Sequence, residues 1–275
     1  MIEIPEAVVL SNQLNSTIKG KVITDVVAAY SPHKFAFFYG DSQSYSSLLV
    51  GERVADSYPR GGMVEICTPK ARIVFGDGAN LTYYAPGSRL PDKHQLLIGF
   101  DDNSFLAVTV QMYAGIWAFQ AGTLDNPYYL VAGEKPSILS KQFNREYFMN
   151  MISDKRVENK SAKALLATEQ RIPGLGNGTL QDILFNAGIH PKKKVQDLSE
   201  QQKDQLFISV RKTVIEMCEK GGRDTEKDLF GNAGGYITKL SRNTSGKPCC
   251  KCGNIIIKEN YLGGTIYYCK ECQPL

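Results

Sequence analysis

The chain has 275 residues, of which 43% are hydrophobic and 22% charged, and this composition suits two globular domains with buried cores. No apolar run approaches the ~20 residues of a membrane-spanning helix, and residues 1–6 lack the basic and then apolar order of a signal peptide. These features exclude a membrane-spanning protein, and we expect a cytoplasmic location with no membrane partner.

The net charge of +4 is distributed unevenly along the chain. Residues 1–135 contain 10 Lys and Arg against 13 Asp and Glu, whereas residues 136–275 contain 22 against 15. The second half is therefore the better binder of a polyanion, although a modest excess of lysine is equally consistent with a soluble surface. The segment 133–136, Gly-Glu-Lys-Pro, suggests a domain boundary near residue 135.

Residues 5–20 are predicted to form a helix, because apolar residues recur at helical spacing between Pro5 near its start and Gly20 at its end. Short β-branched and aromatic runs then alternate with turn signals such as Gly76-Asp77-Gly78. The clearest runs are 35–39, 63–68, 72–75 and 95–100. Residues 1–135 are therefore predicted to form a β-sandwich or barrel-like domain with one leading helix.

After Pro136 the apolar pattern returns to helical spacing. The predicted helices are 142–152, 163–170, 179–187 and 199–220. They define a second, helical domain over residues 136–241, so the whole chain is of the α+β class.

The last segment, residues 242–275, has a pattern of cysteines that is typical of a zinc site. Two Cys-x2-Cys pairs are separated by 16 residues and consist of Cys249, Cys252, Cys269 and Cys272. Four thiolates in two close pairs enclose a tetrahedral ion, while β-like runs at 255–258 and 265–268 form a hairpin between them. We predict a structural zinc ion that contributes on the order of 10 kcal/mol to folding. Cys250 is an alternative ligand to Cys249, but the matched two-residue gaps favour Cys249.

A glycine-rich turn separates the predicted helices 163–170 and 179–187. It includes Gly174, Gly176 and Asn177. The glycines permit close approach of a backbone, and the free N–H groups at the start of the next helix would point outward beside the Asn177 amide. This geometry suits a phosphate, and Lys163 and Arg171 flank it. The alternative is that the segment is only a tight interhelical turn.

Taken together, residues 171–191, the two cysteine pairs and the opening Glu3-Ile-Pro-Glu6 resemble the formamidopyrimidine-DNA glycosylase and endonuclease VIII family over nearly the whole chain. The resemblance implies a β-rich N-terminal domain, a helix-two-turn-helix domain and a zinc-finger hairpin that together clamp damaged duplex DNA, with a base flipped into the cleft. It assigns phosphate contacts to Lys163 and Asn177. The predicted DNA-binding set also includes Arg171, Gly174, Gly176 and Arg242. We expect a monomer.

The catalytic pattern of this family is altered. Members typically begin Met-Pro-Glu and attack the sugar with the proline amine, but this chain has Ile2, so the candidate nucleophile becomes the amine of Met1. Glu3 matches the family's proton-transfer carboxylate, with a helix-start acid as the alternative role. The family's hairpin lysine and zinc-finger arginine fall on Gly62 and Gly264.

Three functions remain open at this point. The first is a divergent base-excision DNA glycosylase, with possible lyase activity, that uses Glu3 and either the amine of Met1 or a directly activated water. The second is a catalytically inactive relative that binds or senses damaged DNA without cleaving it. A third reading, a zinc-stabilised module for protein partners, predicts no salt-sensitive binding to duplex DNA.

Overall fold

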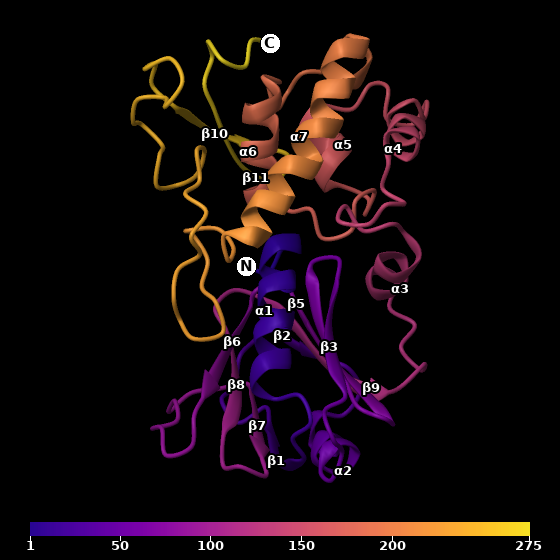
Figure 1. The fold of residues 1–275 in the computed structure, drawn as a ribbon, viewed down its shortest axis with the longest axis vertical. Coiled ribbons are helices and arrows are strands. Elements are labelled where there is room, and N and C mark those ends of the chain that lie inside the picture. The colour runs from indigo at the N-terminus through magenta and orange to yellow at the C-terminus, as the bar shows by residue number, and fades with distance from the viewer.

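The computed structural model describes residues 1–275, and its elements form two parts stacked along the long axis of the molecule (Figure 1). The first part contains helix α1 (Ile4–Thr17), the short helix α2 (Tyr45–Leu49) and nine strands. The strands are β1 (Ile23–Ala28), β2 (Ala36–Phe38), β3 (Asp56–Arg60), β4 (Met63–Cys67), β5 (Ala71–Gly76), β6 (Ala79–Tyr84), β7 (Leu96–Phe100), β8 (Phe105–Val110) and β9 (Ala114–Gln120).

The second part contains the remaining helices and a C-terminal hairpin. The elements are α3 (Pro127–Glu134), which connects the two parts, α4 (Arg145–Ile152), α5 (Ala162–Ala167), α6 (Asn177–Ala187), α7 (Glu200–Glu219), β10 (Ile257–Tyr261) and β11 (Gly264–Tyr268). The predicted α+β class is confirmed. None of the helices combines the length and the apolar character that crossing a bilayer requires.

Helix α1 begins where its sequence predicts, because its first turn is stabilised by a reciprocal cap. The backbone N–H of Glu3 donates to the Glu6 carboxylate, while the Glu3 side chain accepts from the N–H of Glu6. Pro5 lies in this first turn, where a missing N–H costs nothing. The helix ends at Thr17, three residues before Gly20, whose φ of +85° turns the chain towards β1.

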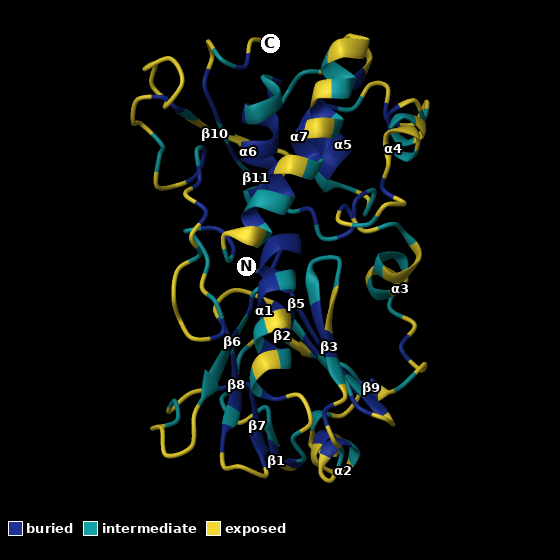
Figure 2. Cartoon of the chain, in the orientation of Figure 1, coloured by how far each residue is buried: buried dark blue, intermediate teal, exposed yellow.

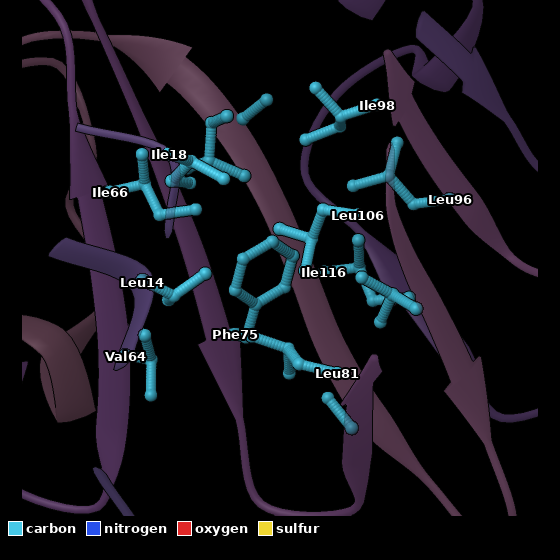
Figure 3. Packing of buried hydrophobic residues seen from close by; sticks show 14 of the residues in the cluster. Leu14, Ile18, Val64, Ile66, Phe75, Leu81, Leu96, Ile98, Leu106 and Ile116 are labelled. Atoms are coloured by element: carbon cyan, nitrogen blue, oxygen red, sulfur yellow. The ribbon is translucent and has the colours of Figure 1, made fainter. Parts of the chain in front are cut away.

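The strands of the first part form two sheets with one core between them. One sheet has the order β1-β7-β8-β6, and the other has the order β2-β9-β5-β4-β3 with only β2 and β9 parallel. Side chains of both sheets and of α1 meet in a single apolar cluster, as Figure 3 shows. Its labelled members are Leu14, Ile18, Val64, Ile66, Phe75, Leu81, Leu96, Ile98, Leu106 and Ile116. The sandwich predicted from alternating apolar runs is therefore confirmed.

Helices α2 and α3 were not predicted. Helix α2 has only five residues, too few for an apolar period to be recognised. Helix α3 has no buried residue, and its Tyr-Tyr-Leu-Val run reads as a strand. Its start was nevertheless signalled, because the Asn126 side chain caps the first turn and Pro127 occupies the first helical position.

Each part of the protein contributes a residue to the hydrophobic core of the other. Ile4 of α1 packs in the core of the helical part, whereas Leu229, which follows α7, packs in the core of the sandwich. The buried upper end of α1 lies against the lower end of α7 in Figures 1 and 2. The junction is therefore a packed interface, and the predicted site residues gather around it.

Candidate functional site

The glycine turn between α5 and α6 is packed tightly against the first part of the protein. Gly174 has φ +80°, and a Cβ there would overlap the backbone of Gly61 and Gly62 at the β3–β4 turn. A Cβ at Gly176 would run into the Glu3 carboxyl group. Both glycines thus allow a close approach, by a backbone at Gly174 and by a carboxyl group at Gly176, and both approaching groups belong to the protein itself.

The start of α6 holds a carboxylate of the same chain. The backbone N–H groups of Gly178 and Thr179 each donate to the Glu3 carboxylate at 2.8 Å. A helix N-terminus favours such an anion because its first N–H groups have no intrahelical partner. The prediction that these N–H groups would be free to hold a phosphate is wrong, because Glu3 already occupies them.

Glu3 also forms an ion pair that the sequence did not reveal. Arg223, which follows α7, donates to Glu3 at 3.1 Å and to Glu6 at 2.7 Å, and all three side chains are buried. Burial alone would raise the pKa of Glu3, but Arg223 and the hydrogen bonds from Thr179 and Gly178 outweigh it and lower the pKa below its ordinary value. Glu3 therefore links α1, α6 and the segment after α7.

The amine of Met1 lies beside a cavity of about 220 Å³ between the two parts of the chain. This amine forms an ion pair with Glu226, which also lines the cavity. The neighbouring Ile2 side chain is buried, and its backbone N–H donates to the carbonyl of Asp77 at 2.6 Å. The N-terminus is thus fixed at the junction, with its amine engaged by a carboxylate.

Lys163 and Asn177 meet at the turn of the C-terminal hairpin. The Lys163 ammonium donates to the carbonyl of Tyr261, and the Asn177 amide donates to the carbonyl of Thr265 at 2.7 Å. A Cβ at Gly264 would lie 3.3 Å from the Lys163 Nζ and 3.6 Å from the Asn177 amide. These side chains from α5 and α6 therefore converge on one point of the hairpin, next to β11.

The two predicted arginines have different surroundings. Arg171 donates to the carbonyl groups of Ala164 and Thr168 at 3.1 and 3.2 Å and pairs with Glu169, so its guanidinium closes the C-terminal end of α5. Arg242 is exposed and makes a single contact of 3.4 Å with the carbonyl of Thr225. Of the two, Arg242 is the more available to a ligand.

The four predicted cysteines form one cluster. The Sγ atoms of Cys249, Cys252, Cys269 and Cys272 all lie within 4.8 Å of one another, and Cys250 is exposed outside the group. Strands β10 and β11 between the pairs are joined by Leu262 and Gly263, which both have positive φ, as in a two-residue type I′ turn. The four-cysteine prediction is confirmed, and the donor set fits a tetrahedral thiophilic ion.

Fold and site together define a class of protein in which a helix-two-turn-helix element faces a four-cysteine hairpin and is joined to a β-sandwich by the N-terminal helix. Residues 133–228 match the model of the formamidopyrimidine-DNA glycosylase H2TH domain. The chain is 24% identical over 280 residues to a formamidopyrimidine-DNA glycosylase of Bacillus cereus, covering 100% of this chain and 99% of the relative. It is 28% identical over 201 residues to a formamidopyrimidine-DNA glycosylase of Prochlorococcus marinus, covering 69% of this chain and 66% of the relative.

Solved structures agree with this fold. The MutM (Fpg) protein of Thermus thermophilus superimposes with a TM-score of 0.82 at 20% identity, covering 98% of both chains. A Lactococcus lactis Fpg in complex with abasic-site DNA superimposes with a TM-score of 0.84 at 19% identity, covering 99% of this chain and 100% of that one. Over its whole length the chain is therefore similar in sequence and fold to formamidopyrimidine-DNA glycosylases, and residues 133–228 match the H2TH domain of that family.

Proposed function

We propose that this protein binds damaged duplex DNA and holds one sugar-phosphate strand where α5, α6 and the C-terminal hairpin meet. The contacts would come from Lys163 and Asn177, with Arg242 as a further cation. Relatives named as DNA glycosylases, and a Lactococcus lactis relative in complex with abasic-site DNA, support this substrate class.

The proposal rests on two polar side chains at the turn of the hairpin that are buried without a full set of partners. Lys163 is 4% exposed and has no carboxylate partner, and the Oδ1 atom of Asn177 is buried without a hydrogen bond. A buried cation without a counter-ion is costly, so such a group is expected where an anion binds. Gly264 contributes no side chain over this point, which leaves space for a phosphate of the backbone.

The hairpin itself depends on the cysteine cluster, and we infer that the metal is zinc. Four thiolates at tetrahedral spacing are the usual ligands of structural zinc. The apolar cluster in this segment is small, and two of its five buried members are cysteines, so the metal would supply much of the segment's folding energy. The hairpin turn would then be rigid enough to face Lys163 and Asn177 at a fixed distance.

We further infer that the protein binds DNA without excising a base. A general acid or base needs a carboxyl group that can reach the sugar and exchange a proton, but Glu3 is buried and accepts from two backbone N–H groups and Arg223. A nucleophilic amine must be free to approach the sugar, whereas the Met1 amine is held by its ion pair with Glu226.

A second candidate function is base excision through the Met1 amine. One observation favours it: the amine borders the cavity of about 220 Å³, where an extrahelical nucleotide would meet it. Borohydride trapping on abasic-site and oxidised-base duplexes separates the two functions. Binding without a covalent adduct and without base release supports the first, and an adduct that forms on the N-terminal residue supports the second.

DNA binding is tested by fluorescence anisotropy of a labelled abasic-site duplex at several salt concentrations. K163M and N177A should weaken binding, and K163M should lower the salt dependence of the binding constant by about one counter-ion. K70A is the matched control, because the Lys70 side chain is 82% exposed on the sandwich. If the unaltered protein retains its metal and binds no duplex at low salt, the proposed function is wrong.

A further inference from the structure

A surface of the sandwich exposes several large apolar side chains next to one another. We call it the aromatic platform and define it by Phe35, Phe37, Met112 and Tyr113, which are 46%, 53%, 64% and 43% exposed. They border an open groove of about 600 Å³ together with His33, Lys34 and Gln111. Isolated exposed apolar residues are common, but a contiguous group of this kind marks an interaction surface.

The backbone fixes the outward direction of the platform's rings. Strand β2 pairs with β9 so that Phe38 lies opposite Ile116 and packs against the sandwich core. Successive side chains of a strand point to opposite faces, so Phe37 points away from that core. The backbone N–H of Phe35 donates to the His33 ring at 3.3 Å, which orders the segment before the strand.

The charge of the platform suits a polyanion that carries flat rings. The Lys34 ammonium lies 5.3 Å from the centre of the Phe35 ring, and no carboxylate lines the groove. Nucleic-acid bases that are not stacked in a duplex bind to surfaces of this kind, where aromatic rings stack on the bases and nearby cations attract the phosphates.

The platform is continuous with the cavity at the N-terminus. Gln111 lines both the platform groove and the cavity beside Met1. The carbonyl of Tyr113 packs against Gly78, whose neighbour Asp77 accepts the backbone N–H of Ile2. A strand that leaves the cavity beside Met1 can therefore pass directly onto the exposed rings.

We propose that the aromatic platform stacks the bases of a short unpaired DNA segment that adjoins the duplex held at Lys163 and Asn177. This inference rests on the proposed function and names its preferred substrate: duplex DNA interrupted by unpaired bases. The rings of Phe35 and Phe37 provide the stacking surface, and Lys34 attracts the strand that carries these bases.

The test compares the affinity of the full-length, metal-loaded protein for two labelled duplexes that differ only in a short central run of unpaired thymines. The unaltered protein should bind the interrupted duplex about tenfold more tightly. The double variant F35A/F37A should lose most of that preference, whereas F35Y/F37Y, which keeps both rings, should retain it. Y128A is the matched control, because Tyr128 is 60% exposed on α3, outside the platform.

The remaining outcomes each decide the question. If F35L/F37L binds the interrupted duplex as well as the unaltered protein does, plain apolar contact replaces stacking and the inference is overturned. A change of oligomeric state in F35A/F37A, with DNA affinity unchanged, would mean that a second copy covers the platform and would also overturn it. Equal binding to both duplexes overturns this inference alone, whereas loss of all DNA binding overturns the proposed function.

Discussion

Arg223 donates to Glu3 across 220 residues of sequence, and this buried ion pair joins the first turn of α1 to the segment that follows α7. The same guanidinium also donates to Glu6 at 2.7 Å, so two carboxylates share one cation. Because a Cβ at Gly178 would overlap the guanidinium, the start of α6 is also shaped around it. The residues expected to carry out chemistry thus form the link between the two parts of the protein.

Removing this cation should destabilise the protein strongly. R223M leaves Glu3 and Glu6 buried without a counter-ion, so we expect the free energy of unfolding to fall by about 3–5 kcal/mol. Urea unfolding followed by circular dichroism measures the change. R156A, which removes an exposed arginine paired with Asp154, should leave the unfolding midpoint unchanged. Equal midpoints for R223M and the unaltered protein would contradict this role of Arg223.

The lowered pKa of Glu3 should make stability depend on pH in acid. The folded chain holds this carboxyl below its ordinary pKa of 4.5, so the folded state binds fewer protons than the unfolded state. The contribution of Glu3 is therefore complete above pH 4.5 and is lost as the pH falls through the lowered value. E3Q cannot ionise and should show a shallower loss of stability below pH 4.5.

The measurement is the urea midpoint of unfolding between about pH 7 and about pH 3 for both proteins. E134Q is the control, because Glu134 is exposed and has no ion pair. Its profile should follow that of the unaltered protein. If E3Q loses stability in acid as steeply as the unaltered protein, another group is responsible for the pH dependence.

The parts of the site that sequence predicted correctly are those with local signals. The two cysteines of each Cys-x2-Cys pair are close because each pair spans a single turn. The hairpin between the pairs is closed by Leu262 and Gly263, which both have positive φ. Helix α6 ends at Ala187, close to the end predicted for it, because the next residue, Gly188, has a φ of +67° that glycine adopts without strain.

The parts that sequence did not predict depend on contacts between distant segments. Nothing near Arg223 indicates that it pairs with Glu3, and nothing in the glycine turn indicates that Glu3 will occupy the N–H groups of Gly178 and Thr179. A phosphate and a carboxylate meet the same requirement at a helix start. Only the fold determines which of these two anions is present there.

Removal of the metal should unfold the hairpin and weaken DNA binding together. C269S removes a buried ligand of the four-cysteine cluster, so the metal content should fall and β10 and β11 should lose their order. C250S is the matched control, because Cys250 is exposed and lies outside the cluster. Elemental analysis and duplex affinity measure both effects. If metal-free C269S binds the duplex with unchanged affinity, the hairpin is not part of the DNA site.

Leu229 should couple the stability of the two parts. It is fully buried in the sandwich core although it follows α7, and its carbonyl accepts the backbone N–H of Tyr83 at 2.9 Å. L229A leaves a cavity in that core and should lower the free energy of unfolding by about 2–5 kcal/mol. I237A, in the same segment but 71% exposed, should change it little. Leu229 anchors the segment that carries Arg223, so L229A should also hasten proteolysis between α7 and the hairpin. If L229A is cleaved at the same rate as I237A, the anchor is not needed.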